Sequence, residues 1–226
     1  MSSDLYVSRH RMGIEMAERG RPRSFDRTQA LDKALMAFWR RGFEATSMND
    51  LVAAMGINSP SIYAAFGSKD ALFAQAVQHY NVAYADGLFR ALKGAPDAAR
   101  GLQAMLEAAI ELFTRPDTPR GCFIVNSVAS NSPGDPAAEQ MLKRLRRERS
   151  AQIAERLRDD VAQGRLRDDT PVQELADLYT AILQGLAQAA RDGVSKRRLR
   201  GVSTRSLSIL SPWIVNGSDP DRAGTA

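Results

Sequence analysis

A short segment of the chain, residues 46–69, carries hydroxyl, amide, phenol and ammonium groups beside small apolar side chains. Groups of these kinds donate hydrogen bonds to phosphate oxygens and to the edges of nucleic-acid bases. The chemistry that the segment favours is therefore recognition of a polyanion. Its candidate contact residues are Thr46, Ser47, Asn58, Ser59, Pro60, Ser61, Tyr63, Ala64 and Lys69.

Two short helices that meet at a sharp turn are predicted to position these side chains. Ser47 is a good N-cap for the first helix, and Asp50 completes a capping box with it. Gly56 ends that helix, because a residue without a β-carbon adopts the left-handed conformation at little cost. We expect Ser59 to cap the second helix and Pro60 to occupy its first position. The pattern is that of a helix-turn-helix.

The second helix is predicted to enter the major groove of DNA. Ile62 and Phe66 lie four residues apart and should point inward, which leaves Ser61, Tyr63 and Ala64 on a smooth outer face. A slim helix of this kind fits a groove about 12 Å wide. The alternative is an ordinary pair of packed helices joined by a glycine turn. The coincidence of two caps, the turn and flanking helices favours DNA binding.

Residues 22–75 resemble the N-terminal domain of the tetracycline-repressor (TetR) family of transcriptional regulators. The resemblance lies in the run Phe38 to Ser47, in Leu51 to Ile57, and in Ser61, Ile62, Tyr63, Phe66 and Lys69. It implies an all-α homodimer with a three-helix DNA-binding head, a C-terminal helical bundle and about nine helices in total. It also implies a double-stranded DNA operator and a small-molecule inducer as partners, with repression as the commoner outcome.

Phosphate contacts are expected from four residues of the head. Lys69 lies at the N-terminus of the next helix, where its ammonium and the exposed N–H groups can meet one phosphate. Tyr63 matches a family tyrosine that binds phosphate, although half-buried packing is its alternative. Thr46 and Ser47 are expected as further donors, with helix capping alone as the alternative for both.

Base reading is harder to assign, because the outer face carries no arginine or glutamine. Asn58 supplies the one amide, so we expect thymine methyl groups to meet Pro60 and Ala64 and DNA shape to contribute. Val52 departs from the family pattern, in which alanine is usual four residues before the turn glycine. Operator preferences therefore cannot be taken from relatives.

Composition excludes several other classes of protein. The chain has 226 residues, a formal charge of +5 and a pI near 9.6, which suits a polyanionic partner. One cysteine, Cys122, and two distant histidines, His10 and His79, exclude a disulfide and a metal site. No phosphate-binding glycine loop or nucleophile motif occurs, so neither an enzyme nor a cofactor is expected. The absence of a signal peptide or a long apolar run predicts a cytoplasmic protein without membrane contact.

The two ends of the chain are predicted to lack regular structure. Residues 1–21 form an irregular basic segment, interpreted as a mobile arm, and residues 216–226 form a disordered tail. Arg19, Arg21 and Arg23 could reach an adjacent minor groove. Translation beginning at Met16 is the alternative for this part of the chain.

The remaining residues are predicted to form the head, at 22–68, and a ligand-binding and dimerisation domain, at 69–215. Asp26 should cap the first helix of the head, which ends at Gly42. A long linker helix is expected to run unbroken from Lys69 to the break at Gly94. Apolar periodicity then predicts helices at 97–113, about 136–164, 171–192 and 195–210, with a short apolar piece at 122–129 and a turn at 131–135.

The last two long helices are expected to pair with their copies in a homodimer. The helix at 171–192 has two apolar faces, one of Val172, Leu175, Tyr179, Ile182 and Leu186 and one of Ala176, Leu183, Ala187 and Ala190. A helix with two apolar faces needs two partners, and the second partner is expected to be another subunit. Burial of both faces within one chain is the alternative.

An inducer pocket is expected inside the C-terminal domain, where a ligand would swing the linker helix and weaken operator binding. Its candidate lining is Phe73, Val77, Tyr80, Tyr84, Met105, Phe113, Cys122, Asn126, Met141 and Tyr179, although residues of this kind are more often plain core than ligand contacts. Oxidation sensing by Cys122 is disfavoured, because its apolar neighbours indicate burial. The alternative function for the whole chain is a helical adaptor whose head binds protein instead of DNA.

Overall fold

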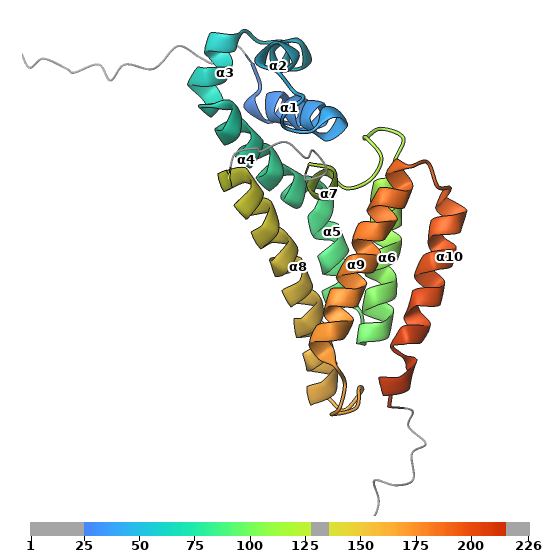
Figure 1. Ribbon diagram of the computed structural model, residues 1–226. Coiled ribbons are helices and arrows are strands. Elements are labelled where there is room, and N and C mark those ends of the chain that lie inside the picture. Colours follow the sequence, from blue (N-terminus) through green and yellow to red (C-terminus); the bar gives the residue numbers. More distant parts are fainter. Residues whose placement is uncertain (1–24, 128–135, 216–226) are drawn as a thin grey trace, which may run out of the picture.

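The computed structural model describes residues 25–127 and 136–215, with side chains from 140 onward in the second range. The predicted arm at 1–21, the tail at 216–226 and the turn at 131–135 lie outside the described residues. Figure 1 shows a head of three short helices at one end of an elongated helical body. The elements are α1 (Arg27–Arg41), α2 (Met48–Met55), α3 (Ser59–Phe66), α4 (Lys69–Tyr80), a π-helical turn (Asn81–Ala85), α5 (Asp86–Gly94), α6 (Ala98–Phe113), α7 (Phe123–Asn126), α8 (Pro136–Ala162), α9 (Val172–Arg191), α10 (Lys196–Ser206) and two 3-10 turns (Leu207–Ile209 and Ser211–Trp213).

The all-α fold expected from the sequence is confirmed for the described part of the chain. Its extended pairing is confined to one isolated bridge between Leu166 and Ile214, which joins the loop after α8 to the C-terminal segment. No helix within 25–127 or 136–215 is long and apolar enough to cross a membrane. The described residues form ten α-helices rather than about nine, because the expected linker helix is divided in two.

Capping side chains fix the helices of the head, as the sequence predicted for two of them. The Asp26 carboxylate accepts from the backbone N–H groups of Thr28 and Gln29 at the start of α1. Ser47 and Asp50 form the expected capping box at the start of α2. Gly56 has a φ of 72° and a ψ of 25°, the left-handed conformation that a side chain would disfavour. α2 and α3 therefore meet at a sharp turn.

The predicted cap of α3 is wrong by one residue. Asn58 is the N-cap, and its Oδ1 accepts from the N–H of Ser61 at 2.9 Å. Ser59 takes the first helical position and Pro60 the second, where a missing N–H is still harmless. Asparagine and serine are equally good N-cap residues, so side-chain chemistry alone did not distinguish a helix that begins after Asn58 from one that begins after Ser59.

An aromatic cluster joins the head to the body. The Trp39 ring of α1 lies edge-on to Tyr80 of α4, with ring centroids 5.0 Å apart, and its centroid is 6.2 Å from that of Phe123 in α7. Tyr80 and Phe123 are themselves 5.5 Å apart. All three side chains are at most 2% exposed. The orientation of α1 relative to α4 and α7 therefore depends on their packing.

Polar contacts flank this cluster. Asp32 of α1 accepts from the Tyr84 hydroxyl at 2.8 Å and contacts His79 Nε2 at 3.1 Å. Burial, together with Asp32, raises the pKa of Tyr84 to about 12, so the phenol stays a neutral donor. The side chain of His79 is only 18% exposed, because it packs toward α1.

The prediction of one unbroken linker helix is wrong. α4 ends at Tyr80, and Asn81–Ala85 forms a π-helical turn closed by a hydrogen bond from the Asp86 N–H to the Asn81 carbonyl. Such turns occur inside α-helices and are frequent at functional sites. The segment contains neither proline nor glycine, so its sequence gave no sign of the break. The turn divides the part of the helix that carries the head from the part that packs in the body.

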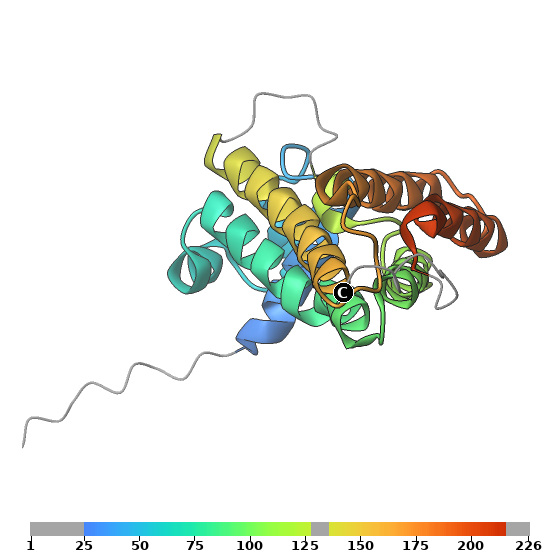
Figure 2. The same cartoon turned by 90° about the horizontal axis from the view of Figure 1, so that it is seen from below.

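The body is a bundle in which α9 lies between α6 and α8. Figures 1 and 2 place α8 and α10 on opposite sides of the bundle. α5 and α6 approach so closely that a β-carbon on Gly101 would lie 2.5 Å from the Leu92 carbonyl oxygen. The Tyr179 hydroxyl donates to the Ser206 carbonyl at 3.0 Å, which ties α9 to α10. The bundle therefore combines close backbone contact with buried hydrogen bonds.

The assignment of the two apolar faces of α9 needs correction. Leu175, Tyr179 and Leu186 of one face are buried within the chain, and so is the second face, Ala176, Leu183, Ala187 and Ala190. α9 has partners on both sides because α6 and α8 flank it. A different stripe, Leu178, Ala181 and Gly185, is exposed on α9, and Val202 of α10 is 52% exposed. These residues are therefore the apolar surface that α9 and α10 leave uncovered within one chain.

Asp160 is the only fully buried acidic side chain in the described part of the chain, at 1% exposure. One carboxylate oxygen accepts from the backbone N–H of Ala98 at the start of α6. The other meets the guanidinium groups of Arg156, at 3.1 Å, and Arg165, at 2.5 Å. Asp160 therefore links α8, α6 and the loop after α8 at the end of the body away from the head.

We predict that Asp160→Asn lowers the free energy of unfolding by about 3 kcal/mol, because two arginines lose their buried counter-charge. Urea unfolding followed by circular dichroism measures the change. Asp169→Asn is the matched control, since Asp169 pairs with Arg167 at the surface, where both side chains are more than half exposed. Equal effects of the two substitutions would contradict the assigned role of Asp160.

We predict that the capping box makes the head sensitive to acid. Hydrogen bonds from the Ser47 hydroxyl and N–H, together with Arg41, lower the pKa of Asp50 from 3.8 to about 2. A carboxyl with a lowered folded-state pKa stabilises the fold above its unfolded pKa and loses that contribution as the pH falls from about 4 to about 2. Thermal unfolding should show wild type more stable than Asp50→Asn at pH 5, with the difference shrinking toward pH 2. A difference independent of pH would refute this assignment.

Candidate nucleic-acid interface

α3 presents the outer face that the sequence predicted. Tyr63 is 50% exposed, Pro60 and Ala64 are exposed, and Ile62 and Phe66 on the opposite side are at most 3% exposed. The other half of the Tyr63 surface is covered, as the alternative of half-buried packing expected. α3 lies at the outer end of the molecule (Figure 1). Its exposed face is narrow and carries a single aromatic ring.

The polar side chains beside this face differ in which of their hydrogen-bond donors and acceptors are already used within the head. Asn58 is exposed, but its Oδ1 serves the α3 cap, which leaves the amide NH2 as a donor. Ser59 and Ser61 are half-buried at the start of α3. The exposed Ser47 hydroxyl donates to Asp50 Oδ2 at 2.7 Å while it accepts from the Asp50 N–H. The one hydroxyl hydrogen of Ser47 is therefore used in the α2 cap, and Ser47 could donate to another acceptor only by giving up its bond to Asp50.

The expectation that Thr46 donates to phosphate is wrong. Its side chain is 0% exposed, and its hydroxyl donates to the Gly42 carbonyl at 2.6 Å. The hydroxyl satisfies a carbonyl at the end of α1 that would otherwise be buried without a partner. Thr46 thus has a structural role in the connection between α1 and α2.

Lys69 lies at the first position of α4, next to the capping residue Ser68. Its ammonium nitrogen is 4.3 Å from the centroid of the Phe43 ring, a cation–π contact at a half-buried site. This contact holds the long side chain against the head. The positive end of the α4 dipole and the Lys69 charge thus coincide at one place, which favours an anion there.

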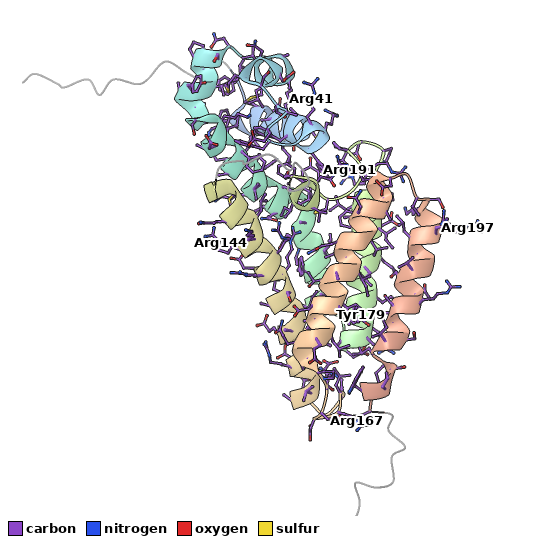
Figure 3. All side chains as sticks on the ribbon, in the orientation of Figure 1. Arg41, Arg144, Arg167, Tyr179, Arg191 and Arg197 are labelled. Carbon is purple, nitrogen blue, oxygen red and sulfur yellow. The ribbon has the colours of Figure 1, made fainter. Side chains whose placement is uncertain are left out.

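Arg27 is a second cation near α3 that sequence reasoning missed. Its guanidinium carbon lies 4.8 Å from the centroid of the Phe66 ring, and it donates to the Gln75 side chain. Arg27 belongs to the first turn of α1, far from α3 in sequence, so only the tertiary structure brings them together. Arg41, at the other end of α1 in Figure 3, pairs with Asp50 of the α2 cap.

A narrow crevice in the body contains part of the predicted inducer pocket. It is mainly apolar, has an open volume of about 20 Å³ and includes Tyr80, Phe113 and Cys122 from the predicted set. Sequence reasoning missed Arg146, Arg149, Leu183 and the other lining residues, which the π-helical turn, α5, α7, α8 and α9 contribute. This volume holds about one water molecule, so anything larger would fit only if the lining side chains moved.

The other seven predicted pocket residues do not line the crevice. Phe73, Val77 and Met105 are fully buried core, and Tyr179 is buried between α9 and α10. Tyr84 contacts Asp32, Asn126 donates to the Arg120 carbonyl, and Met141 lies on α8 beside a separate open groove. Their apolar spacing indicated burial but could not indicate which buried side chains border an empty space.

Cys122 is 3% exposed, as its apolar neighbours predicted. The Tyr80 hydroxyl donates to its Sγ at 3.4 Å, and an Arg149 guanidinium nitrogen lies 3.8 Å from the same atom. Burial and the neighbouring Cys122 raise the pKa of Tyr80 well above its usual value, so the phenol acts as a neutral donor. Within the described ranges, no group of three or more histidine, cysteine or acidic side chains could hold a metal ion.

Two family models match the chain. Residues 30–76 match the model described as bacterial regulatory proteins of the tetR family, a range that covers most of α1, all of α2 and α3, and most of α4. Residues 98–202 match the model described as the tetracyclin repressor-like C-terminal domain. Both halves of the molecule are therefore assigned by independent matches.

Individual proteins agree with these matches. The chain is 36% identical over 195 residues to the HTH-type transcriptional repressor ComR of Escherichia coli (strain K12), covering 84% of this chain and 91% of that protein. It is 29% identical over 180 residues to the transcriptional repressor BdcR of the same organism, covering 80% and 86%.

A solved structure is similar over the same extent. It contains a cysteine mutant of the TetR family transcriptional regulator CifR complexed with 26bp double-strand operator DNA, and it is 40% identical to this chain. The matched region covers 83% of this chain and 98% of the CifR chain, with a TM-score of 0.81. The chain therefore belongs to the tetR family of bacterial regulatory proteins and is a DNA-binding transcriptional regulator.

Proposed function

We propose that the protein is a homodimeric repressor that binds a double-stranded operator through α3 and leaves it when a small molecule binds the body. The observation that carries this proposal is the exposed face of α3, slim enough for a major groove and followed at once by Lys69 at the α4 N-terminus. Repression is supported by the repressors among the relatives. Acting on chromosomal DNA, the protein would work in the cytoplasm.

The proposed DNA contacts divide into two kinds. Lys69 and the Tyr63 hydroxyl bind phosphates and set the position of α3, with the start of α3 and the Ser47 hydroxyl, once it leaves Asp50, as further donors. The Asn58 amide donates to a base edge, and Pro60 and Ala64 meet thymine methyl groups. Ser59 and Ser61, half-buried, contact the backbone of one strand. Because few side chains on this face discriminate between bases, DNA shape contributes part of the specificity.

The domain boundaries that we propose are those expected from the sequence. Residues 22–68 form the head, and residues 69–215 form the ligand-binding and dimerisation domain. α4 serves both parts, since it begins at the proposed phosphate site and ends at the aromatic cluster. A change in its direction would move both heads of a dimer away from half-sites about 34 to 36 Å apart.

Selection of genomic fragments by the purified protein tests the function and identifies the operator. Enrichment of a defined site, followed by a mobility shift on that site, is the expected result. The adaptor alternative predicts no enrichment and no change in fluorescence anisotropy with any duplex at low salt. That outcome would overturn the proposal.

We predict that Lys69→Ala weakens binding to the selected fragment and to unrelated duplexes by the same factor. It should reduce the slope of log K against log salt by about one, because one phosphate contact is lost. Fluorescence anisotropy at several salt concentrations measures both quantities. Lys93→Ala is the matched control, since Lys93 lies on α5 in the body, paired with Glu155. A loss confined to one sequence, or an equal effect of the control, would contradict a phosphate role.

We predict that the dimer forms through the exposed stripe of α9 and α10. Val202→Asp places a charge where a partner subunit would bury an apolar side chain, so sedimentation equilibrium should shift from dimer toward monomer. Val82→Asp is the matched control, because Val82 is 77% exposed and belongs to the π-helical turn. Dissociation by the control alone, or by neither substitution, would contradict this interface.

A further inference from the structure

Two hollows in the body meet at one side chain, Arg149 of α8. The apolar crevice with Tyr80 and Cys122 lies on one side of it. On the other side is a more polar and more open groove of about 200 Å³, which runs between α8 and the π-helical turn with α5. Arg149 and Ala85 line both hollows. Displacement of the Arg149 side chain would therefore join them into one site that is open to solvent.

The partners of Arg149 are all neutral. Its guanidinium donates to Asn81 Oδ1 at 3.0 Å, contacts Cys122 Sγ at 3.8 Å and has its carbon 5.9 Å from the centroid of the Phe89 ring. Among the described residues, no carboxylate lies within 4.0 Å of it. A part-buried cation with neutral partners has unused capacity for an anion, because a charge-assisted hydrogen bond to a carboxylate is stronger than one to an amide.

The charges around the two hollows favour the same kind of ligand. Both charged side chains that line the crevice, Arg146 and Arg149, are arginines. The groove also contains Asp86 and Glu148, but these pair with Arg90, at 2.9 Å, and Arg144, at 3.7 Å. The remaining lining of the crevice is mainly apolar. The surroundings therefore suit a small molecule with one negative charge and an apolar part.

We propose that the inducer is a small carboxylate with an apolar body, whose carboxyl group takes the place of Asn81 on Arg149. The apolar part then occupies the crevice beside Tyr80. This inference rests on the proposed function, since it names the ligand class for the same regulatory domain. It also states how that ligand would reach the DNA-binding head.

The contacts of Arg149 and Tyr80 lead to the head in two steps. The hydrogen bond from Arg149 to Asn81 holds the first residue of the π-helical turn, which follows directly on α4. Tyr80, the residue before it, lies edge-on to Trp39 of α1. A ligand that releases Asn81 and displaces the Tyr80 ring therefore changes both the end of α4 and its contact with α1. Both changes alter the direction of the helix that begins at Lys69.

Ligand class is tested without DNA. Benzoate, phenylacetate and hexanoate are titrated against the full-length protein, each beside its neutral amide, and the melting temperature is followed. The carboxylates should raise it in a saturable way and the amides should not, because only the former make an ion pair with Arg149. Equal stabilisation by acids and amides, or none by any acid of the series, would overturn the proposal.

Three variants test the role of the named residues. Arg149→Gln should weaken carboxylate binding by about tenfold or more, whereas Arg158→Gln, at an exposed position of α8 that lines neither hollow, should not. Asn81→Ala removes the competing acceptor, so carboxylates should bind several-fold more tightly and operator affinity without ligand should fall. Unchanged carboxylate affinity in Asn81→Ala would refute the competition. This variant keeps the test decisive even if Arg149→Gln fails to fold.

The two proposals fail in different ways. If the wild-type protein binds no DNA, the proposed function is overturned, while the carboxylate and amide titrations can still be read. If it binds its selected fragment but no acid of the series changes that affinity or the melting temperature, only the ligand inference is overturned.

Discussion

The packing of Trp39 against Tyr80 and Phe123 is the interaction on which the orientation of the head, and therefore the regulatory function of the fold, depends. It is the place where the head, the linker helix and the body touch through buried rings. Each aromatic pair contributes about 0.5 to 1.5 kcal/mol beyond its buried area. That is strong enough to give the head one orientation and weak enough for a ligand to change it. A regulator needs both properties, because binding can shift an equilibrium only by the difference in affinity between two states.

The head could be predicted from the sequence almost completely, since its signals are local. A cap, an apolar pair four residues apart and a glycine in the left-handed region all act within a few residues of one another. Asn58 displaced Ser59 as cap because two competent capping residues stand side by side. Thr46 was misassigned because its hydroxyl could donate outward or to Gly42, and only the packing of α1 against α2 decides between them.

The body was predicted less well because its important features are long-range. The π-helical turn occurs without a breaking residue, and Asn81 at its start is held by Arg149, which lies on a helix much later in the chain. The spacing of apolar residues indicated which side chains of α9 are buried but not against which helix. Hollows are not encoded by any single segment, so three of the ten predicted pocket residues line the crevice and its arginines were missed.

The pairing of Leu166 with Ile214 also bears on how the protein can be handled. The N–H of Arg167 donates to the Trp213 carbonyl and the N–H of Val215 to the Arg165 carbonyl, at 2.9 and 3.0 Å. These bonds fix the exit of the chain at the end of the molecule opposite α3 (Figure 1). A biotin or affinity tag attached there would tether the protein to a sensor surface with α3 facing the solution.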